Sequence, residues 1–277
     1  MNDQASTLRA RRDGARPVER DPERPVLVIG SGKGGVGKSI VAVMASAALA
    51  RTGRRVLLVD GAQNLGNLHV LLGVRPSLTP AALLDDGAIP DQLLIEVSPG
   101  LWLLPADSGA ESVHRLGATD RARLHRRLTG VYCDFDIVVV DAAAGLDGAV
   151  RCVAMHATRL IVVTVPEPAA LTDAYALMKI VHGQLPRLPF DLLVNRTQHV
   201  DEGATAFDRL STATTRFLGR DLHYAGAIPE DTGMRALARD PRALLGPDGN
   251  TPAQLAVQQL IPSWCDSWVP DLMERSA

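Results

Sequence analysis

The chain has 277 residues, of which 46% are hydrophobic and 22% are charged, and its formal net charge is −2. This size and composition indicate one large globular domain or two small ones. The slight negative charge and the 4% of aromatic residues argue against a nucleic-acid-binding surface. The three cysteines lack metal-ligand spacing. The N-terminal residues 1–25 have no apolar core of the kind a signal peptide needs, and no apolar run approaches the ~18 residues of a bilayer span. We therefore expect a cytoplasmic protein.

Short apolar runs alternate with segments of helical composition from residue 25 onward. Residues 10–25 are instead rich in Arg, Asp, Glu and Pro, which is typical of a solvated linker. The predicted strands are residues 26–30, 56–60, 101–105, 135–141, 159–165, 190–195 and 223–229. The predicted helices are residues 39–53, 115–129, 168–185 and 202–218.

The predicted strands are continuously apolar and do not alternate with polar residues, so both of their faces should be buried. Alternating strands and helices of this kind indicate an α/β fold, with a doubly wound, mostly parallel sheet and helices on both faces. Ligands of such folds bind beyond the carboxyl ends of the strands. Asp60, Asp141 and Asn195 stand at those ends.

A phosphate-binding motif, GKGGVGKS at residues 32–39, lies between the first predicted strand and the first predicted helix. Its small residues allow successive backbone amides to surround phosphate oxygens, and the following helix directs its positive end at the anion. Lys38 should reach the β- and γ-phosphates, and the Ser39 hydroxyl should ligate Mg²⁺. The predicted nucleotide cradle comprises Gly34, Gly35, Val36, Gly37, Lys38, Ser39 and Ile40.

A second lysine in this loop, Lys33, makes the motif more specific. The run KGGVGK resembles the deviant Walker A motif of the MinD/ParA class of P-loop ATPases. In that class the early lysine reaches across a dimer interface to the nucleotide of the partner subunit. The resemblance therefore implies an ATP-dependent homodimer with ATP or ADP and Mg²⁺ as ligands.

Further stretches match that class in the expected order. Asp141 resembles the Walker B acid that holds Mg²⁺ through water, and Gly145 in DAAAG resembles the switch II glycine near the γ-phosphate. Asn195, followed by Arg196, resembles the base-recognition asparagine. The run IPED at residues 228–231 resembles the second base-contact loop, which assigns Pro229 and Glu230 to the base.

Four stretches narrow the resemblance to the FlhG/FleN family of regulators of flagellar number: residues 3–9, 67–84, 103–116 and 167–179. The run DQASTLR at residues 3–9 matches an N-terminal motif with which this family stimulates the GTPase FlhF. The resemblance implies that Asp3, Gln4, Ala5, Leu8 and Arg9 bind such a partner, with Gln4 near its GTP. It also implies a flagellar transcriptional regulator or C-ring protein as a further partner. We expect residues 1–24 to form this element and its linker, and residues 25–277 to form the ATPase domain.

The tail, about residues 250–277, raises the question of membrane binding, because the family usually carries an amphipathic membrane helix there. Trp264, Trp268, Val269, Leu272 and Met273 suit a peripheral site on the inner face of the membrane. However, we expect Pro262 and Pro270 to interrupt any helix, and basic residues are nearly absent. Packing of the tryptophans in the core is the other interpretation.

One catalytic position departs from the family. In the family the stretch around this position reads D-A-D-L-G-L-A-N, and its first acid aligns with Asp60 while its second acid aligns with Ala62. In the family the second acid is the switch I aspartate that organises the attacking water. Lys33, Lys38, Asp60 and Asp141 remain as the predicted catalytic set. Because alanine neither orients water nor accepts its proton, we expect slow hydrolysis with binding retained. The neighbouring Gln63 is a weaker candidate for orienting water, and the alanine is either natural or a deliberate replacement.

Three rival functions remain. An ATP-clamped scaffold that does not hydrolyse would follow from the loss at Ala62. A ParA-type DNA partition ATPase requires a basic dimer surface, and no Lys/Arg cluster stands out, so DNA binding is not expected. A nitrogenase-type electron carrier requires cysteines that bridge a cluster, and Cys133 and Cys152 are poorly placed for that.

Overall fold

The computed structural model describes ten segments of the chain, which are residues 24–62, 66–78, 80–85, 87–106, 118–143, 145–153, 157–234, 240, 244–245 and 251–268. The strands are β1 (Val26–Gly30), β2 (Val56–Gly61), β3 (Ile95–Ser98), β4 (Leu101–Leu104), β5 (Ile137–Ala142), β6 (Arg159–Thr164), β7 (Phe190–Thr197) and β8 (His223–Pro229). The helices are α2 (Lys38–Ala50), α3 (Leu68–Leu71), α5 (Ala118–Tyr132), α6 (Leu146–Val153), α7 (Pro168–Gln184), α8 (Glu202–Leu218) and α11 (Pro252–Trp268). Two short 3-10 helices are η1 (Pro80–Leu84) and η2 (Pro90–Leu93).

Eight strands form one sheet in the order β3-β4-β2-β5-β1-β6-β7-β8. Every neighbouring pair is parallel except β3 with β4. The predicted fold class, a doubly wound and mostly parallel sheet, is therefore confirmed. The loops after β1, β2, β5 and β7 all lie at the carboxyl edge of this sheet, which is where the motif residues were predicted.

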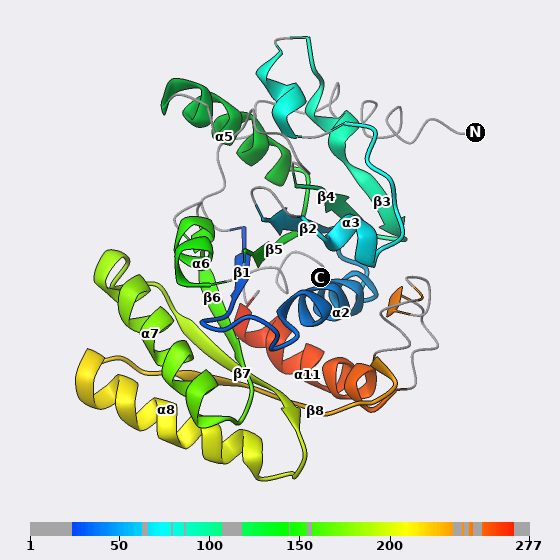
Figure 1. Ribbon diagram of the computed structural model, residues 1–277. Coiled ribbons are helices and arrows are strands. Elements are labelled where there is room, and N and C mark those ends of the chain that lie inside the picture. The colour runs from blue at the N-terminus through cyan, green and yellow to red at the C-terminus, as the bar shows by residue number, and fades with distance from the viewer. Residues whose placement is uncertain are drawn as a thin grey trace.

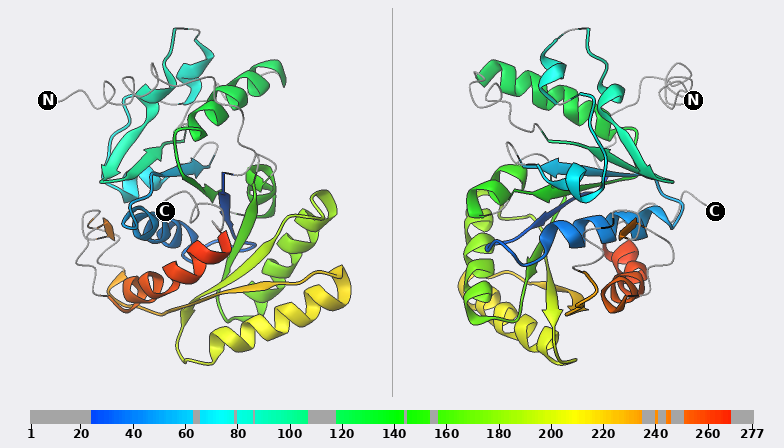
Figure 2. Two further views of the ribbon diagram at one scale, coloured as in Figure 1. Left: turned by 180° about the vertical axis from the view of Figure 1, so that it is seen from behind. Right: turned by 45° about the vertical axis from the view of Figure 1, so that its right-hand side comes forward.

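Helices cover the two faces of the sheet (Figures 1 and 2). Helices α2 and α11 pack on one face, and α5, α6, α7 and α8 pack on the other. Alternate residues of a strand consequently enter opposite cores: Leu27 and Ile29 of β1 face α2, whereas Val26 and Val28 face the other layer. Burial on both faces explains why the strands are continuously apolar.

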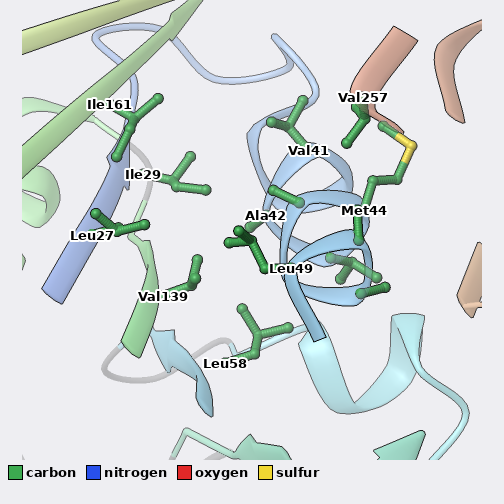
Figure 3. Packing of buried hydrophobic residues seen from close by; sticks show 14 of the residues in the cluster. Leu27, Ile29, Val41, Ala42, Met44, Leu49, Leu58, Val139, Ile161 and Val257 are labelled. Carbon is green, nitrogen blue, oxygen red and sulfur yellow. The ribbon is translucent and has the colours of Figure 1, made fainter. Parts of the chain in front are cut away.

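Helix α2 lies directly against the sheet behind the phosphate-binding motif. Figure 3 shows Leu58 of β2 and Val139 of β5 directed at Ala42 and Leu49 of this helix. All residues from Val41 to Ala50 are buried, because α11 covers the side of α2 that faces away from the sheet. An apolar helix enclosed in this way holds its N-terminus firmly in place.

Strand β3 is an element that the sequence prediction missed. Its four residues are all half-buried, and it joins β4 as an antiparallel edge strand with a register shift between Glu96 and Ser98. A short, half-exposed run of this kind lacks the continuous apolar pattern by which the other strands were recognised.

Helix α11 corrects the expectation that Pro262 interrupts any helix in the tail, because it continues through Pro262 to Trp268. The missing proline N–H costs one backbone hydrogen bond, but the residues beyond it are held by tertiary contacts. Trp264 is 1% exposed and donates its indole N–H to the carbonyl of Ala225, at 2.7 Å, and it stacks on Trp268. The interpretation that the tryptophans pack in the core is thus confirmed for Trp264 and Trp268. The other tail residues named above, Val269, Pro270, Leu272 and Met273, lie outside the described residues.

The far end of α11 is fastened by a buried ion pair. Arg159 of β6 contacts Asp191 of β7 at 2.8 Å and donates a second hydrogen bond to the carbonyl of Ser267. Burial raises the pKa of the Asp191 carboxyl, while the Arg159 guanidinium opposes that shift. Among the described helices, none has both the length and the apolar character that crossing a bilayer requires.

Candidate functional site

The phosphate-binding motif forms a loop from the end of β1 to the start of α2. Gly35 and Gly37 have φ angles of 82° and 86°, a conformation that side chains disfavour. A Cβ atom added at Gly34 or Gly35 would meet no atom within 4 Å, so this part of the loop is open to a ligand. The first amides of a helix lack intrahelical partners, and those of α2 begin directly after Gly37. The loop therefore fits a phosphate group.

The start of the loop is held against α7. A Cβ atom at Gly32 would collide with the carbonyl oxygen of Asp173, so only glycine permits this close approach. The neighbouring Lys33 is 41% exposed at its side chain and makes an ion pair of 3.1 Å with Glu167, immediately before α7. Both contacts connect the loop to the same helix end.

Lys38, the other lysine of the motif, points to the strand ends beneath the loop. Its ammonium group donates a hydrogen bond to Oδ1 of Asp141 at the end of β5, and both side chains are buried. A buried charge pair of this kind is neutral overall, and removal of either member leaves an unpaired buried charge. The structure thus brings together the predicted phosphate lysine and the predicted Walker B acid.

Asp60 stands beside Asp141, with which it is in register across β2 and β5. Its two carboxylate oxygens accept the backbone N–H groups of Ala62 and Leu68, each at 3.1 Å. Burial raises the pKa of the Asp60 carboxyl, and the two backbone hydrogen bonds oppose that shift. Asp60 therefore joins both ends of the segment between β2 and α3.

Ala62, at the position of the expected switch I aspartate, is partly exposed at the start of this segment. Its amide is turned toward Asp60, and the chain then continues toward Gly66. Gly66 lies so close to Asp60 that a Cβ there would be 2.7 Å from Oδ2. Gln63, the alternative water-orienting residue, lies outside the described residues.

Ser39 directly follows Lys38 in the chain, and Gly145 follows Asp141 after the end of β5. Ser39 is partly exposed in the first turn of α2, and Gly145, with a φ of 84°, directly precedes α6. No group of three or more His, Cys, Asp or Glu side chains with metal-site geometry occurs in the part of the chain that the structure describes. A Mg²⁺ ion, which usually keeps several waters and binds one or two protein oxygens, suits a site with Ser39 and Asp141.

A cavity of about 500 Å³ lies beside the loop, between β7, β8 and the start of α11. Of the predicted base and loop residues, Gly35, Gly37, Ile40, Asn195, Arg196, Pro229 and Glu230 line it. Its position next to the phosphate loop and its size suit a nucleoside. The structure therefore places the two predicted halves of the nucleotide site side by side.

Hydrogen bonds shape the wall of this cavity. Arg196 has a φ of 59° and is the one non-glycine residue with positive φ among those described. Its guanidinium contacts Oε1 of Glu230 at 3.3 Å, and Gln198 donates to Oε2 of the same carboxylate at 3.2 Å. The amide of Glu230 in turn donates to the carbonyl of Thr197. The two predicted base-contact loops are thus linked to each other.

Four lining residues escaped the sequence prediction, namely Met44, Thr232, Met234 and Ala253, whereas Asp231 belongs to the predicted IPED loop. Met44 is one helical turn beyond Ile40, so an i to i+4 extension of the motif would have found it. Asp231 accepts the amides of Gly233 and Ala253, which brings the start of α11 to the cavity. No local signal indicated that contact. The predicted partner-binding residues 3–9 lie outside the described residues.

Comparison with known proteins agrees with this geometry. Residues 25–185 match a family described as an AAA domain. The chain is 35% identical over 242 residues to the antiactivator FleN of Pseudomonas aeruginosa, a match that covers 86% of each protein. It is 30% identical over 248 residues to the flagellum site-determining protein YlxH of Helicobacter pylori, covering 88% of this chain and 84% of that protein.

A solved structure shows the same fold. MinD in the MinC:MinD cell division protein complex of Aquifex aeolicus gives a TM-score of 0.69 at 25% identity, covering 89% of this chain and 97% of that one. Sequence relatives and fold thus point to the same class as the loop with its two lysines. The chain belongs to the AAA-domain family of MinD/ParA-class ATPases and, within it, to the FleN/FlhG group.

Proposed function

We propose that this protein is an ATP-dependent, dimerising switch that controls flagellar number and placement. The observation that carries the proposal is the continuous site formed by the phosphate loop, the Lys38–Asp141 pair and the adjoining cavity. The exposed Lys33 at the rim of that site supports dimerisation, because a lysine there is accessible to a second subunit. The names of the two relatives, an antiactivator and a flagellum site-determining protein, support the flagellar role.

The residues of the chain divide the work of binding in this proposal. The amides of the loop and of the first turn of α2 hold the phosphates of ATP. With ATP bound, the Lys38 ammonium would contact a phosphate oxygen, and Asp141 and Ser39 would hold Mg²⁺. Mg²⁺, when bound, neutralises charge on the β- and γ-phosphates. Asn195, Arg196, Pro229 and Glu230 hold the base in the cavity.

Sizing the protein with and without ATP and Mg²⁺ tests this proposal. The mass of the chain is 29.5 kDa, and light scattering should show about twice that mass only when both ligands are present. Lys33→Ala should retain ATP binding but remain monomeric. Without the Lys33 ammonium to neutralise them, the negative charges of the phosphates bound to the two subunits would repel each other across the interface. An unchanged ATP-induced shift in Lys33→Ala would refute the role given to Lys33.

Glu167→Gln is the matched control, because it removes the ion-pair partner of Lys33 and keeps the lysine. Exposed ion pairs contribute only ~0.2–1 kcal/mol. The variant should therefore dimerise much as the parent chain does. Loss of dimerisation in both variants would instead show that the lysine acts through Glu167 of its own chain.

The N-terminal motif supports a separate interaction with an FlhF-type GTPase. A peptide of residues 1–20 should raise GTP hydrolysis by that GTPase, and Gln4→Ala in the peptide should weaken the effect. A scrambled peptide of the same composition controls for charge. If the native and scrambled peptides are equally inactive at high concentration, residues 3–9 have no activating role.

A second candidate function is an ATP-clamped scaffold that holds partners without turnover. Ala62 favours it, because the sequence has an alanine where the resemblance to the family implies a switch I aspartate. In both functions ATP produces a dimer that can bind an activator protein or a C-ring protein of the flagellum. The rate of phosphate release by the dimer separates the switch from the scaffold.

A further inference from the structure

Asn195 makes a contact that base recognition does not require. It is the last residue of the continuous buried run in β7, residues 190–195, and is 8% exposed. Its side-chain nitrogen donates a buried hydrogen bond of 2.7 Å to the backbone carbonyl of Val36, inside the phosphate loop. Because the acceptor is a carbonyl oxygen, the amide nitrogen must be the atom that faces it. The base side of the site and the phosphate loop are therefore joined directly.

The loop is shaped around this contact. A Cβ atom at Gly37 would lie 2.5 Å from the Asn195 side-chain nitrogen, so the amide occupies the space that a side chain would need. The side chain of Val36 is itself 3% exposed, packed with the core around α2. Val36 is thus fixed by its side chain from one direction and by Asn195 at its carbonyl from the other. The peptide that follows, between Val36 and Gly37, leads directly into the N-terminus of α2.

We propose that Asn195 is a positioning residue for the phosphate loop, in addition to its proposed contact with the base. The inference rests on the proposed function only in taking this loop as the phosphate site. Without the Asn195 donor, the Val36 carbonyl becomes a buried acceptor with no partner, and the loop must move to find water. The loop amides then lose the arrangement that surrounds a phosphate.

Binding of magnesium tripolyphosphate, which has no base and no sugar, tests the inference by calorimetry. Asn195→Ala should bind it about tenfold more weakly than the parent chain, the scale expected when a buried hydrogen bond loses its donor. Asn195→Asp, which places a carboxylate oxygen against the Val36 carbonyl, should bind more weakly still. Glu230→Ala is the matched control, because Glu230 lines the cavity and has no hydrogen bond to the loop. It should weaken ATP binding and leave tripolyphosphate binding unchanged.

Hydrogen exchange without any ligand gives a second readout that is independent of ATP binding. Asn195→Ala should exchange faster than the parent chain in residues 32–40, whereas Glu230→Ala should not, and both should keep parent-like protection in β1 and β5. If the parent chain fails to bind ATP, the proposed function is wrong, yet the exchange result still decides the role of Asn195. Two results would overturn the inference. One is hydrogen exchange in the loop of Asn195→Ala that is as slow as in the parent chain. The other is weaker ATP binding by Asn195→Ala with unchanged tripolyphosphate binding.

Discussion

Lys38→Ala is expected to abolish measurable ATP binding. The variant removes the one ammonium group that the structure places beneath the phosphate loop, in contact with Asp141. A charge-assisted contact to phosphate in a partly buried site contributes several kcal/mol, and about 4 kcal/mol corresponds to roughly a thousandfold in affinity. Calorimetric titration with ATP and Mg²⁺ measures the loss. Binding near the strength of the parent chain would refute the assignment of this loop to phosphate.

The same variant should also lower stability, which must be separated from the loss of binding. Removing one partner of a buried ion pair costs about 3–5 kcal/mol, because Asp141 would remain charged and unpaired. Lys38→Ala combined with Asp141→Asn should recover most of that stability without recovering ATP binding. Lys179→Ala, at an exposed position of α7, controls for the loss of a lysine and should change neither quantity.

The features predicted correctly from the sequence have local causes. The glycines of the loop, the buried strand before it and the helix after it are all encoded within residues 26–50, so the loop could be located before the fold was known. The strand ends at Asp60, Asp141 and Asn195 could be aligned because continuous apolar runs imply a parallel sheet. The base-side cavity follows from that alignment and lies where parallel α/β folds bind ligands.

The features that were missed depend on contacts between distant segments. Thr232, Met234 and Ala253 line the cavity, and Asp231 accepts the amide of Ala253 at the start of α11. The expectation for Pro262 considered the local cost to a helix, whereas the packing of Trp264 under β8 decides the outcome. The hydrogen bonds that Asp60 accepts from the amides of Ala62 and Leu68 likewise could not be predicted, because Leu68 reaches Asp60 only through the folding of the intervening segment.

Ala62→Asp is expected to accelerate ATP hydrolysis by about 10²–10⁴-fold, the range for restoring one group that accepts a proton or positions a reactant. Ala62 is partly exposed, so a carboxylate there is not forced into the core. Its backbone is already fixed by Asp60, which accepts the Ala62 amide and also holds the far end of the segment at Leu68. A carboxylate introduced at residue 62 would therefore extend from a backbone that is already held in place.

Phosphate release by the ATP-bound dimer measures this effect, and the lifetime of the dimer should shorten in parallel. Ala62→Asn is the matched control, because it adds a polar side chain of nearly the same size that does not accept the proton of water. If the carboxylate of Ala62→Asp acts as a base, Ala62→Asn should give only a small part of the acceleration. If the side chain only orients the attacking water, Ala62→Asn should give most of the acceleration. Gln63→Ala in the present chain should change the rate little. Equal rates for the parent chain and Ala62→Asp would contradict the switch I argument, and a loss of turnover in Gln63→Ala would then identify Gln63 as the residue that orients the water.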